Sequence, residues 1–146
     1  MTKEELWQYS KLKEELKQLE EQIKDLRASA MFPSSQVITD MPMAPHSDND
    51  KMAEIVSKID DLERLYVQTY DRYLSLKKTI ESEIASLADT SERRIMRLRY
   101  LHGLKWKEIC TAVGYSWRQV HRIHKRALDK VINESEVREN EDVHRN

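Results

Sequence analysis

The placement of glycine and proline is the feature that most limits what this chain can fold into. The 146 residues contain two glycines, Gly103 and Gly114, and three prolines, all of them within residues 31–50. These two residue types most often end helices and form tight turns. Because they are so few, and because 35% of the residues are charged, the sequence favours long solvated helices over a sheet with many turns. We therefore predict an all-α fold.

Residues 1–30 are predicted to form an amphipathic helix. Thr2 followed by Glu5 matches a capping box at its start. Apolar residues then recur at alternating spacings of three and four, which is typical of a coiled-coil seam. These residues are Tyr9, Leu12, Leu16, Leu19, Ile23 and Leu26.

A linker over residues 31–50 and a second long helix over residues 51–88 are predicted next. The linker holds all the prolines and shows no helical period. The helix repeats the three-and-four spacing at Met52, Ile55, Ile59, Leu62, Tyr66, Thr69, Tyr73, Leu76 and Ile80. A second apolar set, made of Leu65, Tyr70 and Leu74, widens its face. The two seams either pack on each other or pair between chains, and we expect this helical arm to form a homodimer.

The near-neutral net charge of −1 hides a strong segregation of charge along the chain. Residues 1–89 carry 12 Lys and Arg against 18 Asp and Glu, whereas residues 90–132 carry 11 against 3. Residues 133–146 are acidic again, with 2 against 5. A basic block between acidic ones indicates a polyanionic partner for that block alone.

The basic block is predicted to be a three-helix unit over residues 89–133, followed by a polar tail over residues 134–146. Asp89 and Ser116 are placed to cap helices, and Gly114 stands where a tight turn needs a positive φ. Apolar stripes mark the buried faces of the three helices. They are Ile95, Leu98 and Leu101; Trp106, Ile109, Cys110 and Val113; and Val120, Ile123, Ala127, Leu128 and Val131.

Cationic and polar side chains remain on the outer side of these stripes, as in a helix-turn-helix unit whose second helix enters the DNA major groove. Five residues of the last helix are predicted to read bases: Trp117, Arg118, Gln119, His121 and Arg122. Trp117 either stacks on the nucleic acid or covers its neighbour. A wider set is predicted to contact phosphates: Arg93, Arg94, Arg97, Arg99, Lys105, Lys107, Ser116, Lys125 and Arg126. The expected partner is double-stranded DNA.

From Tyr100 to Val131 the chain resembles region 4 of the sigma-70 class. The matching residues are Leu104, Glu108, Ile109, Gly114, Ser116, Val120, Arg126, Ala127 and Leu128. Over most of its length it resembles the small phage and prophage regulators of Firmicutes with a sigma-region-4-like domain, the ArpU and RinA types. This resemblance implies a sequence-specific DNA-binding regulator of phage or prophage late genes. Lys105 departs from the Ser or Thr of the sigma pattern, which predicts a weaker helix N-cap.

Two other functions fit the same pattern. A small terminase-like DNA-packaging subunit also joins a helical module to a helix-turn-helix, and a sigma-like adaptor would use the basic block to contact RNA polymerase. No catalytic set of residues is recognisable, so we expect no enzymatic activity, no metal and no cofactor. No segment is apolar enough for a membrane span. Cys110 is the single cysteine and is expected to be a small apolar filler. Because it cannot form an intrachain disulfide, a cytosolic location is expected, and the resemblance to phage regulators implies the cytoplasm of a bacterial host cell.

Overall fold

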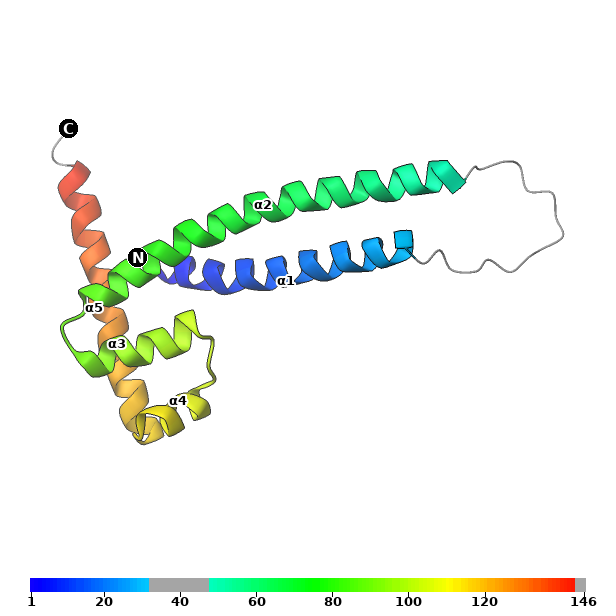
Figure 1. The fold of residues 1–146 in the computed structure, drawn as a ribbon. Helices are drawn as coiled ribbons and strands as arrows, with labels where there is room; N and C mark the ends of the chain where they lie inside the picture. The colour runs from blue at the N-terminus through cyan, green and yellow to red at the C-terminus, as the bar shows by residue number, and fades with distance from the viewer. Residues whose placement is uncertain (32–47, 144–146) are drawn as a thin grey trace. The chain divides into compact units, whose positions relative to one another are not determined.

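The computed structural model describes residues 1–31 and 48–143, and all regular elements within those ranges are helical (Figure 1). The all-α prediction is confirmed. The elements are α1 (Lys3–Met31), α2 (Asp48–Ser86), α3 (Thr90–Met96), the π-helical turn η1 (Arg97–Leu101), α4 (Trp106–Val113) and α5 (Trp117–Val143). Most of the predicted linker lies outside the described residues. The described helices include none that is long and apolar enough to cross a membrane.

The chain divides into two compact units, and α1 and α2 each contribute to both. One unit, Leu12–Arg72, is the helical hairpin. The other unit, Met1–Lys11 with Tyr73–Asn146, contains α3, η1, α4 and α5 and is called here the helix-turn-helix unit. The backbone of α5 remains helical to Val143 and so continues into the segment predicted to be a polar tail.

Within the hairpin unit, the two predicted seams pack on each other in one chain. The helices run antiparallel (Figure 1), and an ion pair joins Arg27 of α1 to Glu63 of α2. Leu16, Leu19 and Ile23 are buried along the seam. By contrast, Leu65 and Tyr70 of the second apolar set remain exposed. The hairpin therefore leaves apolar surface of α2 uncovered.

The first residues of α1 belong to the core of the helix-turn-helix unit, which the seam pattern did not predict. The capping box forms, because the Thr2 amide donates to Glu5 Oε2 at 2.8 Å and the Glu5 amide donates to Thr2 Oγ1 at 3.2 Å. The Tyr9 ring, 1% exposed, stacks on Tyr73 with centroids 5.1 Å apart. The buried residues of this cluster are Met1, Leu6, Tyr9, Ile80, Ile84, Leu87, Met96, Ala127 and Val131.

Contacts between Tyr9 and Tyr73 also explain an ionisation effect. Their hydroxyl oxygens lie 3.2 Å apart, and burial followed by this hydrogen bond raises the pKa of Tyr9 well above its ordinary value of 10.0. The hydroxyl therefore stays neutral and bonded throughout the range in which the domain would work. The N-terminal turn of α1 is thus a structural part of the basic unit.

We expect Tyr9→Ala to destabilise the helix-turn-helix unit by about 3–5 kcal/mol, the usual cost of truncating a fully buried aromatic side chain. Urea unfolding followed by circular dichroism measures this change. Trp7→Ala is the control on the same helix, because Trp7 is 65% exposed. It should shift the unfolding free energy by about 0.5 kcal/mol or less. Equal losses for the two variants would contradict the burial of Tyr9.

Candidate nucleic-acid interface

The turn between α4 and α5 has the geometry predicted from its glycine. Gly114 adopts φ 72° and ψ 24°, in the left-handed region, and its amide donates to the Cys110 carbonyl at 3.0 Å. A Cβ at this position would meet no atom within 4 Å, so glycine is needed for its backbone conformation and not for space. The Gln119 amide then donates to Ser116 Oγ at 3.3 Å, which confirms Ser116 as the cap of α5.

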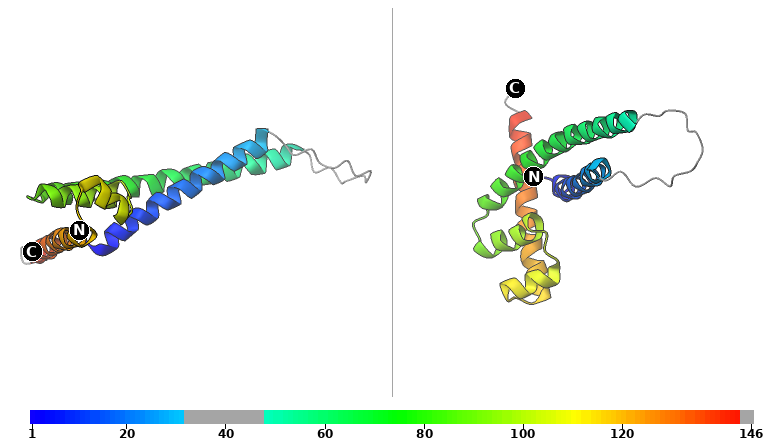
Figure 2. Two further views of the ribbon diagram at one scale, coloured as in Figure 1. Left: turned by 90° about the horizontal axis from the view of Figure 1, so that it is seen from below. Right: turned by 45° about the vertical axis from the view of Figure 1, so that its right-hand side comes forward.

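The helices α3, α4 and α5 come together at this corner (Figure 2), and the apolar residues of the three predicted stripes pack there. Ile95 of α3, Ile109 of α4 and Val120 of α5 are fully buried, and Ile123 is nearly so. Leu98, Leu104, Trp106, Cys110 and Val113 pack around them. Arg118 and Arg122 are exposed on α5. The predicted division of α5 into a buried apolar side and an outer cationic side is therefore present.

The outer side of α5 carries three cations that no other described residue neutralises. Arg118, Arg122 and Lys125 are exposed and follow each other at spacings of four and three, which aligns them on one helix face. In the described part of the chain, their side chains make no hydrogen bond or ion pair. Residues 117–128 contain no carboxylate. This face is consequently a ridge of positive potential.

A different set of cations is bound by one buried carboxylate. Glu92 of α3 is 0% exposed. Arg126 Nε lies 2.6 Å from its Oε1, and Lys130 Nζ lies 2.9 Å and 3.0 Å from its two oxygens. Arg126 also reaches Asp89 Oδ2 at 3.4 Å. Arg126, predicted to contact phosphate, is thus bound to α3 by charge-assisted hydrogen bonds. Glu92 precedes Ile95 by three residues, so the two share the buried face of α3. This spacing is the sequence signal that could have predicted a buried Glu92.

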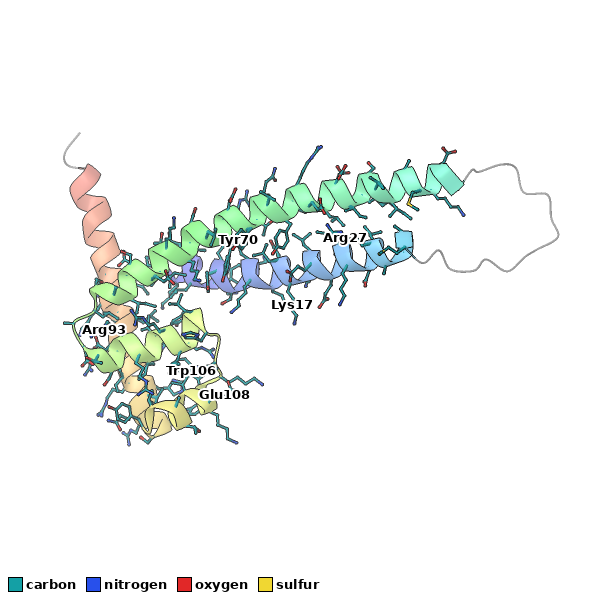
Figure 3. The ribbon with its side chains drawn as sticks, viewed as in Figure 1. Lys17, Arg27, Tyr70, Arg93, Trp106 and Glu108 are labelled. Carbon is teal, nitrogen blue, oxygen red and sulfur yellow. The ribbon has the colours of Figure 1, made fainter. Side chains whose placement is uncertain are left out.

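The arginines of the first helix are also mostly engaged inside the protein. Arg93 donates to the carbonyls of Leu87 at 2.5 Å and Ala88 at 2.9 Å, at the turn after α2 (Figure 3). Arg94 donates to the Ala112 carbonyl at 2.9 Å. Arg99 donates to the Leu104 carbonyl at 3.0 Å and lies over the Trp106 ring at 4.5 Å. Of the four arginines predicted to contact phosphate here, Arg97 alone makes no such contact among the described residues.

Lys105 begins α4 with half of a capping box. Its amide donates to Glu108 Oε2 at 2.8 Å, but an ammonium group cannot accept a hydrogen bond in return. The predicted weaker N-cap is therefore observed. Lys105 and Lys107 are exposed and make no side-chain bond within the described residues, so both remain available to an anion.

Aromatic rings connect the starts of α4 and α5. His121 lies between two indoles, 4.5 Å from Trp106 and 4.6 Å from Trp117. Its Nε2 is buried and has no hydrogen-bond partner among the described residues. His121, predicted to read bases, is therefore half-buried, because its ring packs against Trp106. Trp117 itself is 57% exposed, so it covers His121 on one side and meets solvent on the other.

His124 continues this row of rings and is held neutral. Its Nε2 lies 2.7 Å from the Tyr100 hydroxyl, and its ring meets Trp106 edge-on at 4.6 Å. Burial, the nearby His121 and the Arg99 guanidinium lower the pKa of His124 from 6.5 to about 4. The neutral Nε2 can then accept a hydrogen bond from the Tyr100 hydroxyl. His124 consequently supports the corner and is not a positive contact for DNA at neutral pH.

With this geometry established, comparison with known proteins defines the class of the domain. Residues 84–131, which run from the end of α2 into α5, match the family "Sigma-70, region 4" and form a helix-turn-helix domain of that type. The chain is also 25% identical over 89 residues to "RNA polymerase sigma factor SigO" of Bacillus subtilis (strain 168). That alignment covers 61% of this chain and 45% of the relative, so less than half of the relative is represented. No solved structure matches the chain.

We expect the unfolding free energy to fall as the pH is lowered from 6.5 to about 4, because the unfolded chain then binds a proton that buried His124 resists. Below about 4 both states are protonated and this contribution levels off. Urea unfolding at several pH values measures the effect. His124→Gln should flatten the curve in this window, whereas His102→Gln, at an exposed histidine, should leave it unchanged. An unaltered curve for His124→Gln would contradict the assignment.

Proposed function

We propose that this protein is a sequence-specific DNA-binding transcription regulator that reads the major groove with the first turns of α5. The observation that carries the proposal is the unpartnered cationic face of Arg118, Arg122 and Lys125. A protein that needed these charges for its own stability would pair them, as it pairs Arg126 with Glu92. Leaving three cations unpaired on the recognition helix suits a polyanion.

The contacts of each cation refine the predicted roles. Arg118 and Arg122 are assigned to base edges, since an exposed guanidinium can bind guanine with two hydrogen bonds. Half-buried Gln119 and exposed Trp117 flank them at the start of α5. Phosphate contacts are assigned to those cations of the predicted set that have no partner among the described residues, which are Arg97, Lys105, Lys107 and Lys125. Arg93, Arg94, Arg99 and Arg126 are assigned to the stability of the domain.

We expect Arg118→Ala to weaken binding to a selected duplex by about 1–3 kcal/mol and to leave binding to a scrambled duplex nearly unchanged. Lys125→Ala should weaken both by the same factor, because a phosphate contact carries no sequence information. Fluorescence anisotropy on the two duplexes at two salt concentrations separates these outcomes. Arg126→Ala is the internal control, and it should lower the melting temperature of the domain. Equal losses on both duplexes for Arg118→Ala would refute the base-reading role.

A second candidate function is contact with RNA polymerase. It is favoured by the similarity to a protein named as an RNA polymerase sigma factor. In this case the protein would act as a sigma-like adaptor, and DNA binding by the α5 face would position it at a promoter. Co-purification of the host polymerase with the full-length chain, unaffected by Arg118→Ala, would support this function.

The proposal further places the protein among regulators of phage or prophage late genes. The support is the order of its parts: a helical arm, a proline-containing segment and a second long helix before the sigma-region-4-like domain. Sequencing of the DNA bound by the protein in its host would locate its sites. Sites confined to prophage regions would support this role, whereas sites at housekeeping promoters would argue against it.

Homodimerisation through the hairpin unit is also part of the proposal. Val56 and Val67 of α2 are exposed, and Val67 is 58% exposed. They are separated by 11 residues, close to three turns at 3.6 residues each, so they share one helix face. An uncovered apolar stripe on a helical arm is the kind of surface through which two copies associate.

We expect Val67→Glu to convert the dimer to a monomer, because a carboxylate would have to be buried at the apolar contact. Sedimentation velocity on the purified chain measures the mass. Gln68→Glu adds the same charge at the neighbouring exposed position and should leave the dimer intact. A wild-type monomer, or an assembly of eight or more chains as in packaging subunits, would contradict the dimer.

A further inference from the structure

A cationic groove lies on the helix-turn-helix unit, between the end of α2 and η1, away from the predicted base-reading residues. One hollow of about 700 Å³ is lined by residues of both elements, including Lys77, Lys78, Glu81, Arg97 and His102. A second hollow of about 390 Å³ shares Arg97 and His102 and continues along α3 past Arg93 and Arg94. Together these hollows are called here the α2–η1 groove.

The π-helical turn explains why cations gather at this groove. The His102 amide donates to the Arg97 carbonyl at 3.0 Å, a bond that spans five residues. The two residues therefore stand one above the other on the same face of η1. In an α-helix, at 3.6 residues per turn, they would lie about 140° apart. The α-helical period of the sequence therefore places Arg97 and His102 on different faces, and only the π-helical turn brings them together.

The positive charges of the groove exceed the negative charges that the described residues place beside them. In the described residues, the side chains of Lys77, Lys78, Arg97 and His102 make no hydrogen bond and no ion pair. Glu81 is the carboxylate among the residues lining the first hollow. The excess of donors over acceptors leaves this surface suited to an anion with many oxygens.

The lining residues favour a phosphate backbone over an acidic protein surface. Protein interfaces depend on buried apolar and aromatic anchors at their centre. None of the large hydrophobic residues that are exposed in the described structure lines either hollow. Phosphate contacts need only cationic or hydrogen-bond donors, which the groove supplies.

The groove is also connected to the recognition helix. Arg94, at its α3 end, donates to the carbonyl of Ala112, in the last turn of α4 just before Gly114. From Arg94 to His102 the helical axis rises by at most about 12 Å, the value for an α-helix at 1.5 Å per residue. That length corresponds to about three to four base pairs at 3.4 Å each. A DNA strand that leaves the base-reading site at the start of α5 would meet hydrogen-bond donors over these three to four base pairs.

We propose that the α2–η1 groove binds the phosphate backbone of duplex DNA flanking the sequence read by α5. This inference rests on the proposed DNA-binding function and adds α2 to the interface. Lys77, Lys78, Arg97 and His102 are the contacting residues, and Glu81 limits the affinity. The groove adds affinity and lengthens the footprint but contributes no base specificity.

The test uses the full-length protein and a duplex selected from a random library, with flanks of about 10 base pairs on each side or none. Lys77→Gln combined with Lys78→Gln should weaken binding to the flanked duplex about tenfold at about 0.1 M salt and reduce its salt slope by about 1.8. Binding to the unflanked duplex should not change. Lys13→Gln combined with Lys17→Gln removes the same charge from exposed positions of α1, where Figure 3 labels Lys17. This control should match the wild type.

Glu81→Gln provides a test in the opposite direction. Removing the carboxylate should tighten binding to the flanked duplex, a gain that a damaged fold would not produce. Equal losses on flanked and unflanked duplexes, or wild-type affinity of the double lysine variant for the flanked duplex, would overturn the groove proposal alone. Failure of the wild-type protein to bind any selected duplex would overturn the proposed function itself, and the groove proposal with it.

Discussion

The burial of Ile95, Ile109 and Val120 against one another is the contact on which the rest of the interface depends. Each of these residues comes from a different helix, and each is fully buried. Their packing fixes the angle between α4 and α5, and Gly114 supplies the backbone conformation that the angle requires. Once Val120 is buried, the helical period places Arg118 and Arg122 on the outside. The direction of the cationic ridge is therefore a consequence of apolar packing.

The cations of the basic block have two roles. Some bond to a buried carboxylate or to carbonyls within the protein, and the others remain exposed to a ligand. The carboxylate of Glu92 is fully buried and would be costly without partners. Arg126 and Lys130 provide those partners. Arg93 and Arg94 of α3 similarly bond to carbonyls at the C-terminal ends of α2 and α4, where helix termini leave acceptors unsatisfied. Of the eleven Lys and Arg residues of the basic block, six make no side-chain bond among the described residues and remain available to a ligand: Arg97, Lys105, Lys107, Arg118, Arg122 and Lys125.

The N-terminal turn of α1 extends the domain beyond the segment that resembles sigma-70 region 4. Tyr9 occupies the seam position predicted for a coiled coil, yet it is buried beside Tyr73 in the same core as Met96 and Ala127. Farther along the same helix, Leu16 and Ile23 are buried in the hairpin unit. One continuous apolar repeat thus serves two different cores. A repeat specifies which side of a helix is apolar, but it does not specify the partner.

The sequence by itself determined the helical class, the corner at Gly114, the cap at Ser116 and the buried stripe of α5, because these follow from local backbone preferences and helical periodicity. Only the tertiary structure decided which arginines face outward, since a pair such as Arg126 and Glu92 is separated by 34 positions along the chain. The tertiary structure likewise turned His121 inward between two indoles and brought Arg97 over His102 through a π-helical turn. Such outcomes depend on which surfaces meet, and short-range sequence patterns do not contain that information.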